Sequence, residues 1–370
     1  MNILKNTLKH IDNIRIDSNG NIKARFNAFA IPSGSLGRLE ELATLYASIK
    51  DTVNCTIKHK KIFTLAGDHG VAAEGVSAFP REVTLQMVKN FMEGGAAINI
   101  LARHIGAQVI VVDCGVASEV DTQSLSVLTK DRRLKIKKIG PGTRNMAVGP
   151  AMTREDAVKS IEGGIELIEE EIKEGLDIIG TGDMGIANTT PSSAILAVLG
   201  KLDVERATGR GTGLSDELLQ KKIHIIKKAI EINQPNPDDP IDVLAKIGGF
   251  EIGGIAGLCL GAARHHIPVV LDGFISTAGA LIACAIEPKV NKYLIASHVS
   301  AEQGHKIMLK HLHKIPLLDL NMRLGEGTGA ALGIGMVEAG VKLLNEMVTF
   351  HEAGVSKPHD QQEQTLNTYL

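Results

Sequence analysis

The chain has 370 residues, of which 44% are hydrophobic, and its 42 acidic and 40 basic side chains leave a net charge of −2. No overall positive charge is available to attract nucleic acid or an anionic membrane. With 3% aromatic residues and no tryptophan, the chain also offers few platforms on which unpaired bases could stack. We therefore expect neither a nucleic acid nor a membrane as partner.

In chain order, short apolar runs rich in Val and Ile indicate buried parallel strands at 62–66, 109–112, 177–181, 267–271 and 293–296. Between them, apolar residues at three- and four-residue spacing predict helices at 83–104, 155–174, 217–232 and 301–313. This alternation predicts an α/β fold: a mainly parallel sheet with helices on both faces, as in Rossmann-like three-layer proteins. Each strand runs into a cluster of Gly, Asp, Ser or His, at the sheet edge where such folds bind ligands.

The two ends of the chain have a different pattern. Residues 35–49 and 329–348 are predicted as helices with no strand between them, and the tail from residue 356 is polar. We therefore predict a large α/β substrate-binding domain over 55–328. A small helical domain would combine 1–54 with 329–370.

Neither the cysteines nor the histidines have the spacing of a metal site. The four cysteines are far apart and form no CxxC pair, which also argues against a disulfide framework. His265 and His266 are adjacent and point to opposite faces of an extended chain, and His311 and His313 do not face each other on a helix. We expect no metal and no cofactor.

The N-terminus lacks the continuous apolar segment of a signal peptide. The longest apolar stretch, 275–286, is shorter than the roughly 20 residues that span a bilayer. We expect a soluble protein in the cytoplasm.

A single carboxylate, Glu326, stands in a glycine-rich segment, 323–329, just before an apolar helix. Glycines at such a place let backbone N–H groups approach an anion, and the helix N-terminus adds partial positive charge. This pattern is typical of a phosphate site beside a general base. In the alternative interpretation, Glu326 only caps backbone amides at the start of the helix.

A second glycine-rich turn, 209–213, precedes a predicted helix that carries Lys221 and Lys222. The turn is neither a Walker A motif nor a GxGxxG after a strand. It could bind phosphate with Lys222 as a point charge, or be a flexible loop with solvated lysines.

Small polar residues fill 182–190, between a predicted strand and a helix that starts near Pro191. Thr189 or Thr190 would cap that helix, with Pro191 at its first position. Capping does not explain Asp183.

Together, several long blocks resemble the nicotinate-nucleotide–dimethylbenzimidazole phosphoribosyltransferase family, from about residue 30 to 345. The blocks are PSGSLGRLE (32–40), AGDHG (66–70), EGVSAFP (74–80), QMV (86–88), TGDMGIANTT (181–190), GGFEIGG (248–254), DGFI (272–275), SHVS (297–300) and RLGEGTGAAL (323–332). The resemblance implies that phosphoribose passes from nicotinate mononucleotide to 5,6-dimethylbenzimidazole. The products would be α-ribazole 5′-phosphate and nicotinate, in assembly of the cobalamin nucleotide loop. It also implies a homodimer.

The resemblance implies roles for particular residues. Glu326 would be the catalytic base that takes the benzimidazole proton. The wall of the acceptor pocket would include Ser77, Phe79 and Gln86. The nucleotide-phosphate side would include Gly211, Thr212, Gly213, Lys222, Ser297 and Gly327. Further substrate-binding residues would be Asp183, Met184, Gly185 and Gly325.

Two positions depart from the family pattern. The opening block reads Ile31-Pro32-Ser33 where the family commonly has Lys-Pro-Pro, so no charge is expected at position 31. Asp183 stands where a Glu is frequent and is one methylene shorter, which leaves its role open.

Two alternatives to this activity remain. One is a paralogue or subunit of the same fold that acts on another lower-ligand base, or that binds without turnover; the intact glycine loop around Glu326 argues against loss of turnover. The other is a nucleotide-binding oxidoreductase. The absence of GxGxxG and of a ribose-binding acid after the first strand disfavours it.

Overall fold

One parallel sheet organises the computed structural model, which describes residues 3–120, 132–211 and 213–356. Within these residues the sheet has six strands in the order β3-β2-β1-β4-β5-β6. The strands are β1 (Lys60–Gly67), β2 (Gln108–Gly115), β3 (Arg132–Ile136), β4 (Ile178–Met184), β5 (Val269–Leu271) and β6 (Leu294–Ala296). The α/β class and all five predicted strands are confirmed, and β3 is an additional edge strand. The sequence order of the strands runs outward in one direction from β1 to β3 and in the other direction from β4 to β6. In such sheets ligands bind at the carboxyl ends of the strands, near the point where this order reverses.

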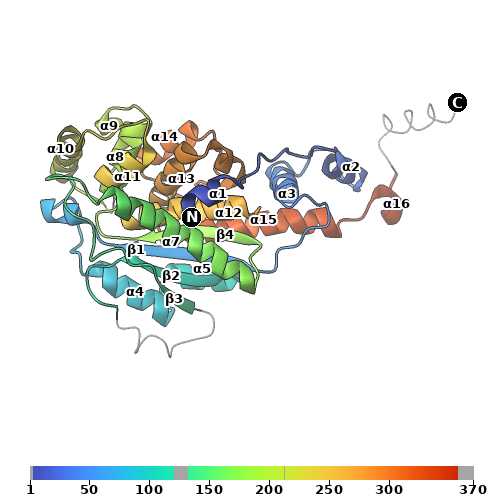
Figure 1. Ribbon diagram of the computed structural model, residues 1–370. Helices are drawn as coiled ribbons and strands as arrows, with labels where there is room; N and C mark the ends of the chain where they lie inside the picture. The colour runs from blue at the N-terminus through green and yellow to red at the C-terminus, as the bar shows by residue number, and fades with distance from the viewer. Residues whose placement is uncertain (1–2, 121–131, 212, 357–370) are drawn as a thin grey trace. The chain divides into compact units, whose positions relative to one another are not determined.

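Helices lie on both faces of this sheet (Figure 1). In the same unit as the sheet they are α1 (Ile3–Leu8), α4 (Val83–Glu93), α5 (Ala97–His104), α7 (Arg154–Glu171), α8 (Thr189–Leu199), α9 (Val204–Ala207), α10 (Asp216–Asn233), α11 (Pro240–Ile247), α12 (Phe250–Arg264), α13 (Phe274–Ile286), α14 (Gln303–His311) and the first turns of α15 (Thr328–Glu346). Short 3-10 turns are η1 (Gly70–Glu74), η2 (Ile172–Glu174) and η3 (Pro288–Tyr293).

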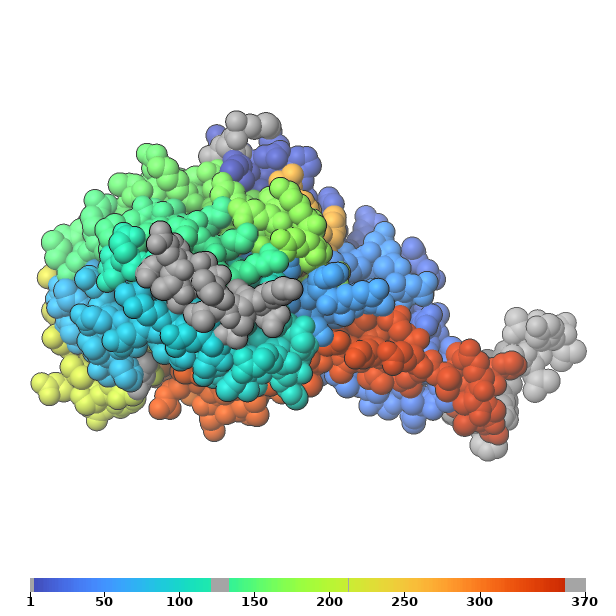
Figure 2. Space-filling model, turned by 90° about the horizontal axis from the view of Figure 1, so that it is seen from below, coloured from blue at the N-terminus to red at the C-terminus, as the bar shows by residue number. Residues whose placement is uncertain are grey.

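The single helix predicted over 83–104 is wrong, because the segment forms two helices, α4 and α5. Gly94 ends α4 in a left-handed conformation (φ 84°), and its N–H donates to the carbonyl oxygen of Asn90. This conformation costs a glycine little and stops a helix. Parts of α4 and α5 lie at the molecular surface, where they are light blue to cyan in Figure 2. Ile100 of α5 is exposed.

Alternate residues of β1 face opposite layers of helices. Ile62 and Thr64 point toward the loop before α15, since a Cβ on Gly327 would lie 2.7 Å from Ile62. Leu65 points to the other face, where a Cβ on Gly254 of α12 would lie 2.5 Å from its side chain. Glycine at position 254 therefore lets α12 pack directly on the strand.

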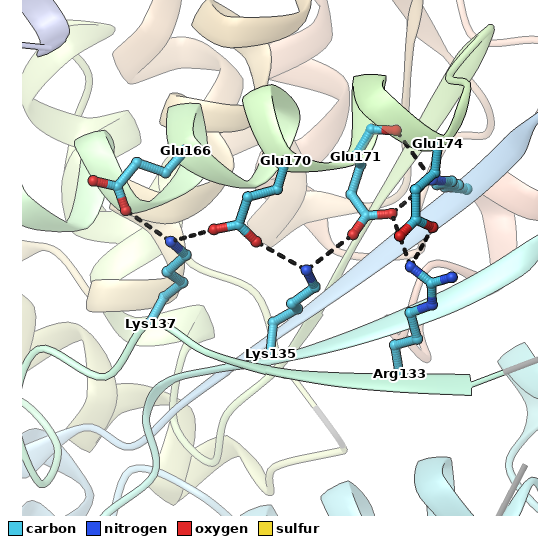
Figure 3. Close-up of polar contacts among 8 residues, drawn as sticks. Arg133, Lys135, Lys137, Glu166, Glu170, Glu171 and Glu174 are labelled. Carbon is cyan, nitrogen blue, oxygen red and sulfur yellow. Dashed lines mark hydrogen bonds and ion pairs between the residues drawn. The ribbon is translucent and has the colours of Figure 1, made fainter. Parts of the chain in front are cut away.

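A ladder of ion pairs joins the edge strand β3 to α7 (Figure 3). Arg133, Lys135 and Lys137 alternate along the strand and just beyond it, so their side chains share one face. Their partners are Glu166, Glu170, Glu171 and Glu174. Glu171 is buried and also accepts a hydrogen bond from Lys61 on β1 over 2.6 Å. The ladder thus ties the edge of the sheet to its covering helix.

The described chain divides by its internal contacts into two compact units. One takes in the residues up to 13 and 58–334; the other takes in 14–57 and the residues from 335 onward. The second unit contains α2 (Asn21–Ala28), α3 (Arg38–Ile49), the later turns of α15 and α16 (Phe350–Ala353). Within it, the Arg25 side chain donates to the carbonyl oxygen of Leu344 over 2.7 Å. The domain boundaries predicted at 54/55 and 328/329 stay a prediction. Of the helices that the structure describes, none is both long enough and apolar enough to cross a membrane.

Candidate active site

A cavity of about 290 Å³ lies at the carboxyl ends of β4, β5 and β6, within the unit that holds the sheet. This is the edge at which the sequence places its polar clusters. Seven of the predicted site residues line the cavity: Phe79, Asp183, Met184, Gly185, Gly211, Gly325 and Glu326. Apolar side chains form much of the remaining wall: Val83, Met87, Ile186, Phe274, Ile275 and Leu324. A flat apolar molecule fits such a wall.

Glu326 sits in a backbone segment that few sequences can adopt. Gly325, Glu326 and Gly327 all have positive φ, at 87°, 65° and 101°. For the glutamate this conformation costs roughly 1–2 kcal/mol, so it persists only where the surroundings fix it. Here the hydroxyl of Thr64 donates to the carbonyl oxygen of Glu326 over 2.7 Å, and the N–H of Glu326 donates to the carbonyl of Asp183 over 3.1 Å.

The carboxyl group of Glu326 is buried on the cavity wall, with 5% of the residue exposed. Burial raises the pKa of this carboxyl, although its Oε2 accepts a hydrogen bond from the N–H of Ile98 in the first turn of α5. A carboxylate with a raised pKa is a stronger base. The alternative in which Glu326 caps backbone amides holds only for that one bond at the start of α5. The amides of its own helix donate to Asp272 instead.

Asp183 is the penultimate residue of β4 and lines the same cavity, so the structure brings the two acids together. Its Oδ2 accepts a hydrogen bond from the side-chain amide of Asn188 over 2.9 Å, and its Oδ1 has no partner among the described residues. Burial, and then the neighbouring carboxylate of Asp272, raise the pKa of Asp183 well above its usual range. Both effects favour the protonated form of Asp183.

Lys222 lies behind the cavity wall and is fully buried, so the alternative of a solvated lysine is wrong for this residue. Its ammonium group donates to the hydroxyl of Thr189 over 2.7 Å and to the carbonyl oxygen of Gly209 over 3.3 Å. Burial lowers its pKa to about 8, with the nearby carboxylate of Glu302 opposing the shift. Since Thr189 and Gly211 line the cavity, the cation stands one layer behind it.

The predicted cap of α8 is also wrong. The helix begins at Thr189, earlier than expected, and Asn188 precedes it without a side-chain cap. The hydroxyl oxygen of Thr189 accepts a hydrogen bond from the ammonium group of Lys222 and does not cap the helix.

Other predicted site residues do not line the cavity: Ser77, Gln86, Gly213, Lys222, Ser297 and Gly327. Gln86 and Gly213 are exposed. The hydroxyl of Ser297 is turned inward and donates to the carbonyl oxygen of Leu271 over 2.5 Å. Thr212 lies outside the described residues.

Sequence reasoning named no site role for five polar residues that line the cavity: His298, Ser300, Glu302, Arg323 and Asn188. His298 and Ser300 lie in the SHVS block after β6, and this polar cluster at the end of a strand could have indicated them as site residues. Burial raises the pKa of Glu302, while the Lys222 ammonium and the Gly211 N–H oppose the shift. Among the described residues, no group of three or more His, Cys, Asp or Glu side chains could hold a metal ion.

Comparisons with known proteins agree along nearly the whole chain. Residues 11–355 match the family model DBI_PRT, described as phosphoribosyltransferase. A Geobacter sulfurreducens protein named nicotinate-nucleotide–dimethylbenzimidazole phosphoribosyltransferase is 54% identical over 96% of this chain and 99% of its own length. A Desulforudis audaxviator protein of the same name is 51% identical over 96% and 99%. The crystal structure of CobT from Thermus thermophilus superposes with a TM-score of 0.85 and 41% identity, covering 92% of this chain and 99% of that one.

Proposed function

The chain belongs to the phosphoribosyltransferase family whose model its residues 11–355 match, and on that premise we propose that it transfers phosphoribose from nicotinate mononucleotide to 5,6-dimethylbenzimidazole. The products are α-ribazole 5′-phosphate and nicotinate, and the reaction serves assembly of the cobalamin nucleotide loop. One observation carries this proposal. The buried carboxyl group of Glu326 faces an apolar wall of the cavity, and a buried lysine, Lys222, stands behind the cavity lining at Thr189 and Gly211.

Glu326 is the general base of this reaction. One ring nitrogen of the benzimidazole gives its proton to the carboxylate, and the electron pair of the other attacks the anomeric carbon of the ribose. The bond from that carbon to the pyridine nitrogen breaks, and nicotinate leaves with the electron pair. Because a single displacement inverts the carbon, the β-nucleotide gives an α-product. A general base typically contributes about 10²–10⁴-fold to such a rate.

The cavity wall suits the two substrates in different places. Phe79, Val83 and Met87 are an apolar surface for the flat acceptor. For the nucleotide, Gly211 lines the part of the cavity that we assign to the phosphate, and the buried Lys222 supplies positive charge from behind that lining. Asp183 lies beside Glu326 on the same cavity wall, where we expect its side chain to contact the substrates.

The chain acts as a homodimer in the cytoplasm. The cysteines support this location, because all four are free thiols: Cys55, Cys114, Cys259 and Cys284. Light scattering after size-exclusion chromatography should give about twice the 39.4 kDa of one chain.

The assay mixes the purified chain with nicotinate mononucleotide and 5,6-dimethylbenzimidazole and follows both products by chromatography. Nicotinate should appear in equal amount with α-ribazole 5′-phosphate, and only when the acceptor is present. Nucleotide binding without nicotinate release would show a binding protein instead. Release with adenine or a phenol, but not with benzimidazoles, would show a transferase for another base.

A further inference from the structure

Asp272, the residue that follows β5, places its carboxylate under the loop that carries Glu326. Its Oδ2 accepts the N–H of Gly327 over 3.0 Å. Its Oδ1 accepts the N–H groups of Gly329 and Ala330 over 2.6 and 3.3 Å. One buried side chain therefore satisfies three backbone amides on either side of the start of α15.

The geometry favours a carboxylate at this position over other side chains. Both oxygens face N–H donors, so an amide in its place would set an NH₂ group against a backbone N–H. The N-terminus of α15, a helix of 19 residues, carries partial positive charge that stabilises an anion. Burial raises the pKa of Asp272 to about 7, while the three backbone N–H donors oppose the shift. Its ionised form accepts these bonds about twice as strongly as a neutral acceptor would.

The backbone of Asp272 is itself held by hydrogen bonds to neighbouring side chains. The Ser297 hydroxyl donates to the carbonyl oxygens of Leu271 and Asp272, over 2.5 and 3.2 Å. The N–H of Asp272 points at the hydroxyl of Thr181 over 3.4 Å. Gly329 completes the fit, since a Cβ there would lie 2.8 Å from Asp272 Oδ1 and 2.1 Å from the ring of His298.

We propose that Asp272 is a positioning residue, whose carboxylate holds residues 327–330 so that Glu326 keeps its strained left-handed backbone and presents its carboxyl group to the cavity. The inference rests on the proposed function for the role of Glu326 as base. Asp272 acts through that loop, because Gly273 rather than Asp272 itself lines the cavity. Its loss should therefore lower turnover more than nucleotide binding.

The test compares Asp272→Asn, Glu326→Gln and the double variant in the full chain. Asp272→Asn should lower kcat by roughly 10- to 100-fold, the range expected for losing a charge-assisted hydrogen bond, and leave the KM for the nucleotide within about threefold. The double variant should be no slower than Glu326→Gln alone, because the two residues act as one unit. Effects that multiply in the double variant would overturn the proposal.

Asp113→Asn is the matched control. Asp113 is another buried aspartate, in β2 at the same sheet edge, and its Oδ1 accepts the N–H of Val116 over 2.8 Å away from the cavity lining. It should lose thermal stability with kcat within about threefold of the parent protein. A kcat loss equal to that of Asp272→Asn would show a general structural effect and overturn the proposal.

Amide hydrogen exchange supplies a readout that needs no turnover. In Asp272→Asn, exchange should rise by about 10-fold or more in peptides covering 325–332 and stay unchanged in β1 and β4. Unchanged exchange in 325–332 would refute the positioning role. If the parent protein releases no nicotinate, the proposed function fails, while the exchange result still decides the positioning of the loop. Should Asp272→Asn not fold, Asp272→Ser keeps one acceptor oxygen without added bulk, and the same outcomes apply to it.

Discussion

The backbone N–H of Glu326 donates to the carbonyl oxygen of Asp183 over 3.1 Å, although the two residues belong to segments far apart in the sequence. This bond joins the carboxyl end of β4 to the loop before α15. The contact is close because Gly182 has no side chain: a Cβ there would lie 2.4 Å from the carbonyl oxygen of Glu326. The position of the proposed base therefore depends on a glycine in the neighbouring strand.

Gly182→Ala should displace the Glu326 loop. Since the obstructing atoms belong to the backbone, we expect a loss of about 1–3 kcal/mol in the free energy of unfolding, together with a fall in kcat. Urea unfolding and steady-state kinetics on one preparation measure both. Gly149→Ala is the control, because nothing lies within 4 Å of a Cβ at that position. Equal behaviour of the two variants would contradict the close packing described here.

Asp183→Asn should make the protein more stable at alkaline pH and less active. Because burial raises the pKa of Asp183, the folded state binds more protons than the unfolded state above the ordinary aspartate pKa of 3.8. This group therefore lowers stability as pH rises, and the amide removes that loss. Urea unfolding at pH 8 and pH 5 should show a gain for the variant that shrinks at the lower pH.

The activity of the same variant tests the role of Asp183 in the site. We expect kcat to fall by roughly 10-fold, the effect of losing about 1.4 kcal/mol of interaction with the reacting substrate. An Asn variant that is as active as the parent protein would reduce Asp183 to a structural partner of Asn188.

Binding of the nucleotide should take up a proton near pH 8.5. The pKa of Lys222 is lowered from 10.5 to about 8, so the free protein holds part of this group uncharged at that pH. An arriving phosphate favours the ammonium form, while Glu302 already faces it from the cavity side. Calorimetry in two buffers of different ionisation enthalpy measures the uptake. Lys221→Met, at the exposed neighbouring lysine, should keep it, and Lys222→Met should abolish it.

The free energy of unfolding of the ligand-free protein should depend on pH through the same residue, Lys222. Between about pH 8 and 10.5 its folded state binds fewer protons than its unfolded state, so this group makes stability rise with pH through that window. The full effect is about 3 kcal/mol and is lost in Lys222→Met. If the free energy of unfolding of the parent protein and of Lys222→Met changed with pH in the same way above pH 8, the lowered pKa of Lys222 would be contradicted.

Glu171→Gln should be far more destabilising than Glu166→Gln, although both belong to the ladder of Figure 3. Glu171 is buried with Lys61, and breaking a buried pair from one side costs about 3–5 kcal/mol. Glu166 pairs with Lys137 at the surface, where such pairs contribute about 0–1 kcal/mol. The Lys61 and Lys135 ammonium groups overcome burial and hold the pKa of Glu171 below its usual value. Urea unfolding should therefore show the difference at pH 7 and less of it as pH falls below about 4.5.

The five strands and the edge that carries the site could be predicted because buried parallel strands are short apolar runs with polar residues at their ends. Strand β3 could not, since its sequence RRLKI has the charges of a surface segment. Arg133 and Lys135 are paired with glutamates of α7 and η2, and an edge strand tolerates such charges. Only the tertiary partner reveals the strand.

The limits of prediction at the site have a similar cause. Apolar spacing continues across Gly94, so periodicity alone did not break the helix at 83–104. Thr189 is a residue type that commonly caps helices, yet its hydroxyl accepts a hydrogen bond from Lys222 of α10. Ser297 faces the backbone of Leu271 instead of the cavity, and the contribution of Asp272 emerges only when β5 and the start of α15 are seen together.

The most direct test of the account is the rate of nicotinate release by Glu326→Gln compared with the parent protein. Glutamine keeps the shape of the side chain and an acceptor oxygen for the N–H of Ile98, but it cannot take the proton of the acceptor base. We predict a fall in kcat of about 10²-fold or more, with nucleotide affinity and melting temperature nearly unchanged. A variant with the kcat of the parent protein and a lowered melting temperature would contradict the assignment of Glu326 as the base.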